Sequence, residues 1–136
     1  VQTLTFKWSA IVVSLPLLLL IGEILMVNNS CDRIADEIAG RRTLAILLGE
    51  QKSVIASRSI LLVALLIQLL LPLLGLIPMV TLFFTIGGAL LALPIWVKME
   101  KRGFSLETKG ISMGGISKIY LIHCLFFGVA LLISYF

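Results

Sequence analysis

Residues 59–97 read SILLVALLIQLLLPLLGLIPMVTLFFTIGGALLALPIWV, a stretch of 39 residues without one charged side chain. A helix needs about 20 apolar residues to cross the hydrocarbon core of a bilayer, so this stretch is long enough to cross it twice. Gly75 and Pro78 interrupt the apolar pattern near its middle, where they predict a tight turn between two antiparallel helices. We therefore expect membrane-spanning helices at about residues 57–76 and 79–97.

Two further apolar segments flank this hairpin, at about residues 9–27 and 116–136, and each is near the length that crosses a bilayer at ~1.5 Å per residue. The chain is 60% hydrophobic and only 13% charged, and its mean hydropathy of +1.14 lies outside the range of soluble globular domains. The sequence therefore predicts an all-α, polytopic membrane protein with four transmembrane helices in one membrane domain, residues 1–136.

The basic residues are distributed unequally between the two sides of the expected membrane. Ten of the eleven Lys and Arg residues lie on one side, eight of them between the first and second or the third and fourth spans and two, Arg58 and Lys118, at the adjoining span ends. Because Lys and Arg accumulate on the cytoplasmic side, we expect residues 28–49 and 98–115 to face the cytoplasm of a plasma-membrane protein. Topology then explains the net charge of +4, and no nucleic acid is expected as a partner.

The N-terminal sequence superficially resembles a secretory signal, because Lys7 precedes an apolar run. The run is long and lacks a small-x-small cleavage site, so we expect it to remain as a membrane span. Since the sequence starts with Val1 directly before that span, we expect a fragment or one half of a larger protein.

Residues 28–49, NNSCDRIADEIAGRRTLAILLG, form a polar segment between the first two spans. If the first helix continues into this segment, ~100° per residue places Asn29, Asp32 and Asp36 within about 60° of one another. Asn28 lies somewhat to one side. Carboxylate and amide oxygens are the hard ligands that Mg²⁺ accepts, usually together with water and substrate phosphates.

Basic residues follow this acidic face directly. Gly40 is placed to end the helix in a left-handed cap, and Thr43 is placed to cap a short helix over residues 44–48. Between them, Arg41 and Arg42 carry guanidinium groups that suit phosphate oxygens. The pattern suggests a metal-diphosphate site, but on spacing alone a solvated loop that only sets the topology is the more common explanation.

The ordered string N-N-x-x-D-x-x-x-D-x-x-x-G-R-R-T-L-A-x-L-L-G across residues 28–49 resembles the second aspartate-rich motif of the UbiA superfamily of membrane prenyltransferases. Its paired asparagines and its Gly-Arg-Arg-Thr-Leu-Ala continuation most resemble the 1,4-dihydroxy-2-naphthoate polyprenyltransferases of menaquinone biosynthesis. The context is also similar, since one span precedes the motif and three follow it, as in the last four of that family's nine helices.

The resemblance implies a reaction and a set of site residues. In this family Mg²⁺ held by two aspartate-rich motifs binds a polyprenyl diphosphate, whose ionisation gives an allylic cation that attacks an aromatic acceptor. By position, Asp32 and Asp36 would be the catalytic carboxylates. The residues that would bind Mg²⁺ are Asn28, Asn29, Asp32 and Asp36. The residues that would contact the diphosphate are Arg41 and Arg42.

Two features depart from the family pattern. The first aspartate-rich motif, of the type N-D-x-x-D, is absent from this sequence, so we expect the chain to be inactive without an N-terminal half of the same protein. Cys31 stands where the naphthoate enzymes commonly carry arginine. This departure counts against the naphthoate as the acceptor more than it counts against the resemblance to the superfamily.

Three polar residues lie within the expected spans. On an ideal helix Glu23 points roughly 180° from Asp32, so we expect it to make a helix contact unless the helix bends near Gly22. Gln68 and His123 are expected to form interhelical hydrogen bonds. The alternative for the whole chain is a non-catalytic membrane subunit or a transporter fragment with a charged connector, although these polar residues are too scattered to indicate broken transporter helices.

Overall fold

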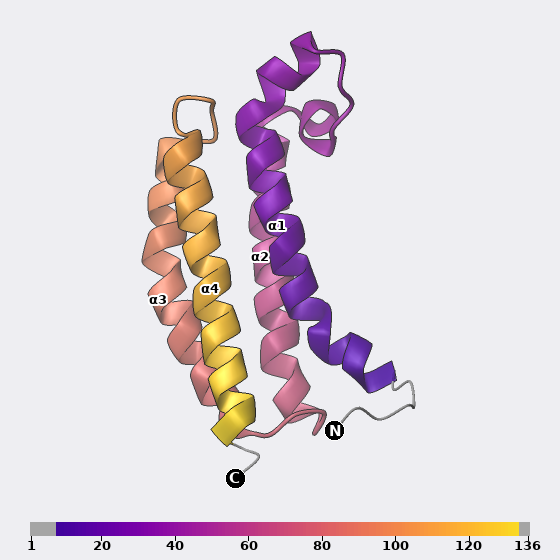
Figure 1. Cartoon of the computed structure of the whole chain (residues 1–136), viewed down its shortest axis with the longest axis vertical. Coiled ribbons are helices and arrows are strands. Elements are labelled where there is room, and N and C mark those ends of the chain that lie inside the picture. The colour runs from indigo at the N-terminus through magenta and orange to yellow at the C-terminus, as the bar shows by residue number, and fades with distance from the viewer. Residues whose placement is uncertain (1–7, 134–136) are drawn as a thin grey trace.

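The structure is a computed structural model that describes residues 8–133, and it consists of four α-helices (Figure 1). The helices are α1 (Trp8–Ile38), α2 (Leu44–Leu73), α3 (Val80–Arg102) and α4 (Lys109–Ile133). No β-strand occurs between residues 8 and 133. The prediction of an all-α chain with four spans is confirmed, because each helix is long and apolar enough to cross a membrane.

The outer surface of the helices is apolar as well as the interior. Leu62, Phe83, Leu90 and Leu125 are among the large hydrophobic side chains that are more than half exposed. A soluble protein rarely exposes so much continuous apolar surface, whereas lipid tails solvate it without cost. The four helices therefore suit a lipid bilayer.

The helices pack as two antiparallel pairs, α1 with α2 and α3 with α4, and contacts of α1 with α4 and of α2 with α3 join the pairs (Figure 1). The turn between α2 and α3 includes Gly75, whose φ of +69° is one that glycine adopts without strain. The four helices thus alternate in direction along the chain, as the sequence pattern predicts.

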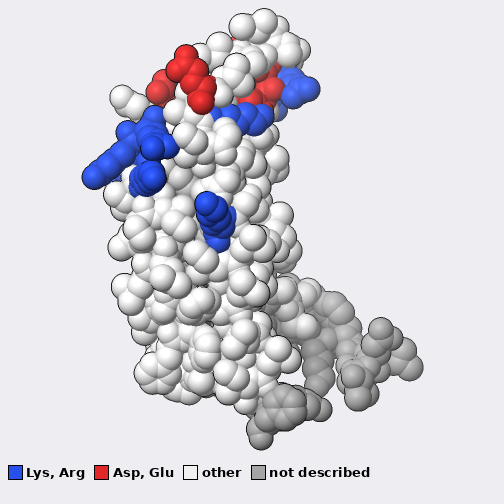
Figure 2. All heavy atoms as spheres, turned by 60° about the vertical axis from the view of Figure 1, so that its left-hand side comes forward, with Lys and Arg blue, Asp and Glu red and all other residues white. Residues whose placement is uncertain are grey.

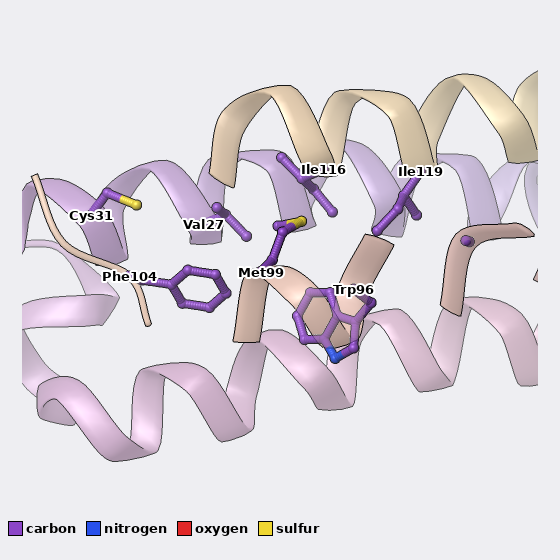
Figure 3. Close-up of a cluster of buried hydrophobic side chains, with 8 residues drawn as sticks. Val27, Cys31, Trp96, Met99, Phe104, Ile116 and Ile119 are labelled. Atoms are coloured by element: carbon purple, nitrogen blue, oxygen red, sulfur yellow. The ribbon is translucent and has the colours of Figure 1, made fainter. Parts of the chain in front are cut away.

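A cluster of buried side chains joins three helices near one end of the bundle (Figure 3). The ring of Trp96 meets that of Phe104 edge-to-face, with centroids 6.2 Å apart. The cluster comprises Val27, Cys31, Ala92, Trp96, Met99, Phe104, Ile116 and Ile119. It fixes the polar end of α1 against α3 and α4.

The observed helices are longer than the apolar spans from which they were predicted. α1 continues to Ile38, because the polar residues after position 27 are compatible with a helix, which ends only before the left-handed cap at Gly40. For the same reason α3 continues to Arg102 and α4 begins at Lys109. α2 begins at Leu44 and is broken at Gly49, so its first part is a separate short helix.

The predicted final span also included residues 134–136, which lie outside the described residues. Of the other predicted ends, 9, 76 and 79 lie within three residues of the observed helix ends Trp8, Leu73 and Val80, whereas α3 extends five residues beyond the predicted 97. Hydropathy thus predicts an apolar part within each helix, and it does not predict the polar extensions.

Charged side chains gather at the end of the bundle where α1 ends, α2 begins, α3 ends and α4 begins (Figure 2). We call this the charged end. The opposite end carries the turn between α2 and α3, residues 74–79, which has no charged side chain. The polar segment 28–49 and the α3–α4 loop therefore lie on the same side of the expected membrane.

Candidate functional site

The polar segment begins as the last part of α1, which carries Asn29, Asp32 and Asp36 to the charged end. The helix ends in a Schellman-type cap. Gly40 has φ +72°, its N–H donates to the carbonyl of Glu37 at 3.0 Å, and the N–H of Arg41 donates to the carbonyl of Asp36 at 2.9 Å. The cap reverses the chain and brings Arg41 back beside Asp36.

Asp36 is paired with the arginine that follows this cap. Nη1 of Arg41 donates to Oδ1 of Asp36 at 2.9 Å, and the Asp36 side chain is only 9% exposed whereas that of Arg41 is 69% exposed. A nearly buried carboxylate is thus held by a cation that itself faces solvent. The guanidinium is accessible to an anionic ligand.

Asp32 is paired with a lysine from a distant part of the chain. Nζ of Lys109, the first residue of α4, donates to Oδ2 of Asp32 at 2.5 Å. This contact joins α1 to α4 across 77 positions of sequence. Sequence reasoning counted Lys109 only as a topology-setting residue, because no local pattern connects it to Asp32.

The remaining predicted site residues, Asn28, Asn29 and Arg42, form no ion pair with any described residue. Asn28 and Asn29 are half-buried, and Arg42 is exposed. Arg33, between the two aspartates, contacts Glu50 of α2 at 3.3 Å. The structure therefore brings Asp32, Asp36 and Arg41 to one helix end.

Thr43 has the predicted capping role. Its φ of −109° and ψ of 158° are extended, and its Oγ1 accepts from the N–H of Ile46 at 3.3 Å. The short helix after it ends at Gly49, with φ 74° and ψ 177°. The break at Gly49 thus separates the short helix at the end of the motif from the long apolar part of α2.

The donor set suits Mg²⁺ as a partial site. Asp32 and Asp36 offer hard carboxylate oxygens one helical turn apart, and Mg²⁺ is commonly held by one or two carboxylates together with substrate phosphates and water. No group of three or more His, Cys, Asp or Glu side chains between residues 8 and 133 could hold a metal ion. These residues thus fit two ligands of a Mg²⁺ ion that needs phosphate or further protein ligands.

Glu23 of α1 contacts α2, whereas Asp32 contacts α4. Glu23 is fully buried, and its Oε1 accepts a hydrogen bond from Oγ of Ser57 on α2. The helix continues through Gly22 without a break, so Glu23 makes a helix contact and lies away from the Asp32 face, as the helical angle predicts.

An apolar groove of 260 Å³ lies between α2 and α3. Most of its lining is aliphatic, from residues such as Leu61, Leu65 and Leu93, and Arg58 and Glu100 also line it. Nε of Arg58 donates to Oε1 of Glu100 at 3.0 Å. The groove can receive part of a hydrocarbon chain, and sequence reasoning missed it because it depends on how two apolar helices meet.

A family model described as the UbiA prenyltransferase family matches residues 1–107. The chain belongs to the UbiA prenyltransferase family. No curated protein and no solved structure matches it. The match includes the whole of segment 28–49, so the superfamily resemblance read from that segment is confirmed.

Membership of the UbiA family agrees with the observed architecture. The family consists of membrane prenyltransferases, and this chain has four helices that could each cross a membrane. The chain is therefore a multi-pass membrane protein of a transferase family. Prenyl diphosphates, aromatic acceptors and the lipid bilayer are the partners that this family suggests.

Proposed function

We propose that this chain supplies one part of the active site of a Mg²⁺-dependent UbiA prenyltransferase, which transfers a polyprenyl group from its diphosphate to an aromatic acceptor. The observation that carries the proposal is the placement of Asp32 and Asp36 one turn apart at the charged end, each bonded to a basic side chain. Carboxylates beside basic side chains are groups that suit a metal-diphosphate complex.

Each group of the site has a distinct task in this proposal. Asp32 and Asp36, assisted by Asn28 or Asn29, hold the metal, which when bound neutralises charge on the leaving diphosphate. Arg41 and Arg42 donate hydrogen bonds to diphosphate oxygens, and the accessible guanidinium of Arg41 supports this role. The Arg residues thereby favour cleavage of the C–O bond, where negative charge develops on the diphosphate.

The spanning helices supply the apolar surroundings. Their aliphatic side chains accept the isoprenoid tail and keep water from the reactive carbon, and the groove between α2 and α3 offers one such hydrocarbon-lined surface. We further propose that the site faces the cytoplasm of the plasma membrane, because ten of the eleven basic residues belong to the charged side.

Two finer assignments extend the proposal. The acceptor we favour is 1,4-dihydroxy-2-naphthoate, in menaquinone synthesis, on the basis of Asn28, Asn29 and the Gly-Arg-Arg-Thr-Leu-Ala continuation. We also propose that the complete enzyme contributes another aspartate-rich motif, of the type N-D-x-x-D, from its N-terminal half. This part of the proposal rests on the resemblance of segment 28–49, which implies that two aspartate-rich motifs hold the Mg²⁺ and that Asp32 and Asp36 belong to one of them.

The test is prenyl transfer by the complete enzyme that contains this sequence, in membranes, with a labelled polyprenyl diphosphate. We expect Asp32→Ala and Asp36→Ala each to lower the Mg²⁺-dependent rate about a hundredfold or more, without loss of membrane insertion. Glu37→Ala is the matched control, because Glu37 is an exposed carboxylate on the same helix. Retained activity in both aspartate variants would contradict the metal assignment.

A comparison of acceptors tests the finer assignment. We expect 1,4-dihydroxy-2-naphthoate to be prenylated and 4-hydroxybenzoate to be a poor substrate. Transfer to 4-hydroxybenzoate alone would leave the family activity in place and exclude the naphthoate. Absence of transfer to any aromatic acceptor, by a well-inserted and stable protein, would favour a non-catalytic membrane subunit.

A further inference from the structure

Lys109 is the basic residue in contact with Asp32, and no motif of the sequence assigns it a role. Its Nζ lies 2.5 Å from Oδ2 of Asp32, with the lysine side chain 33% exposed and the aspartate 18% exposed. In contrast, Glu50 of the Arg33–Glu50 pair is 73% exposed, so water screens that pair more strongly. The Lys109–Asp32 contact is therefore the better shielded of the two.

The loop before α4 fixes the position of Lys109. Oγ1 of Thr108 accepts from the N–H of Ser105 and donates to the carbonyl of Gly103, both at 2.9 Å. The carbonyl of Thr108 accepts from the N–H of Ser112 at 2.9 Å. These bonds hold the first turn of α4 in place, so the ammonium is tethered beside α1.

The two proposed metal ligands are thus arranged alike. Asp32 carries Lys109 on one oxygen and Asp36 carries Arg41 on one oxygen. Arg41 follows α1 directly, whereas Lys109 belongs to the other helix pair. A divalent cation on Asp32 would repel the ammonium from that carboxylate.

We propose that Lys109 is a diphosphate-binding residue, which holds Asp32 in the metal-free protein and bonds a diphosphate oxygen once Mg²⁺ is bound to that carboxylate. This inference rests on the function proposed above. The released ammonium would keep its tether at the start of α4 and so would stay near Asp32, where phosphate oxygens would complete the coordination of a bound metal. Ammonium groups are established phosphate partners in proteins.

This exchange of partners makes two binding equilibria depend on Lys109 with opposite sign. Without diphosphate, the ammonium competes with Mg²⁺ for Asp32 and weakens metal binding. With Mg²⁺ in place, the same ammonium strengthens diphosphate binding. The two ligands are therefore coupled through Lys109, and the coupling is reciprocal.

The experiment uses calorimetric titration of the complete enzyme in nanodiscs, first with Mg²⁺ alone and then with inorganic pyrophosphate at saturating Mg²⁺. We expect Lys109→Met to bind Mg²⁺ alone several-fold more tightly, because its competitor is gone. We expect the same variant to bind pyrophosphate about tenfold or more weakly, the loss typical of a hydrogen bond to a charged group. Lys109→Arg retains the charge, so its pyrophosphate affinity stays close to that of the wild type.

Lys118→Met is the matched control, because Lys118 is an exposed lysine on the same helix and its loss changes the net charge equally. We expect both of its affinities to equal those of the wild type. If Lys109→Met and Lys118→Met changed the two affinities equally, the cause would be the loss of one positive charge. That result would overturn the assignment of Lys109 to diphosphate binding. If Lys109→Met does not fold, Lys109→Gln, which can still donate to Asp32, must show the same pair of opposite changes.

Other outcomes separate this inference from the function on which it rests. If Asp32→Ala abolishes Mg²⁺ binding but Lys109→Met leaves pyrophosphate affinity unchanged, the Lys109 role is wrong and the metal site stands. If Lys109→Met lowers the affinity for Mg²⁺ and the unfolding temperature together, the contact with Asp32 is only structural. If the wild type binds no Mg²⁺ through Asp32, both proposals fail.

Discussion

Gln68 of α2 and His123 of α4 are joined by a 2.9 Å hydrogen bond between Oε1 and Nδ1, in the buried interior of the bundle. The two residues are 1% and 3% exposed. α2 and α4 are not packed neighbours, so this bond crosses the bundle and links the two helix pairs. The prediction that both residues form interhelical hydrogen bonds is confirmed, and they are each other's partners.

We expect Gln68→Leu and His123→Leu each to lower the free energy of unfolding by about 1 kcal/mol, the usual value for such a bond within a membrane. The double variant is expected to cost less than the sum, because the second substitution removes a group that has already lost its partner. Unfolding in detergent measures all three variants. Ser59→Ala is the control, since Ser59 is exposed and bonds only within its own helix. Strictly additive costs would show that the bond does not contribute.

The contact between Glu23 and Ser57 gives a second prediction. Glu23→Gln keeps an oxygen that accepts from the Ser57 hydroxyl, and it exchanges Oε2, which has no partner among the described residues, for an amide nitrogen. We therefore expect prenyl transfer within about tenfold of the wild type, far above that of Asp32→Ala. Ser57→Ala leaves Glu23 without its donor and is expected to cost about 1–3 kcal/mol of stability. An activity loss in Glu23→Gln equal to that in Asp32→Ala would place Glu23 in the chemistry.

The features that sequence predicts well are those that depend on neighbouring residues. The uncharged stretch 59–97 identifies two spans and a turn, because its length can be compared directly with the thickness of a bilayer. The left-handed cap at Gly40 and the helix start at Thr43 can be predicted because glycine is strongly favoured at the first position and threonine at the second. The motif 28–49 identifies the family for the same reason, since its residues are contiguous.

The contacts between helices could not be predicted in this way. The surface of a membrane helix is apolar toward lipid and toward its neighbours, so the hydrophobic pattern does not show which face is buried. Lys109 therefore gave no sign that it reaches Asp32, and Arg58 gave none that it pairs with Glu100. The groove between α2 and α3 depends on the same helix rotations.

Gly40 and Gly49, which lie on either side of the last part of the motif, residues 41–48, differ in backbone conformation. Gly40 lies in the left-handed region at a helix cap, where Asn is also tolerated. Gly49, with φ 74° and ψ 177°, lies in a region that is essentially restricted to glycine. We expect Gly49→Asn to cost about 1–3 kcal/mol of stability and Gly40→Asn less than about 1 kcal/mol. Unfolding in detergent compares them, and equal costs would contradict the break at Gly49.

The close approach of α4 to α3 at Gly115 gives the last prediction. A Cβ at Gly115 would overlap Sδ of Met99 and lie 2.7 Å from its Cγ, whereas a Cβ at the adjacent Gly114 would meet nothing within 4 Å. We expect Gly115→Ala to cost about 1–3 kcal/mol, because Met99 is buried and must move within a packed cluster. Gly114→Ala is the matched control and is expected to be neutral or stabilising by up to about 1 kcal/mol, as a helical Ala replaces Gly. Adding Met99→Ala should reduce the additional cost of Gly115→Ala, since it removes the overlapping atoms; an unchanged cost in that background would show that the helices do not meet here.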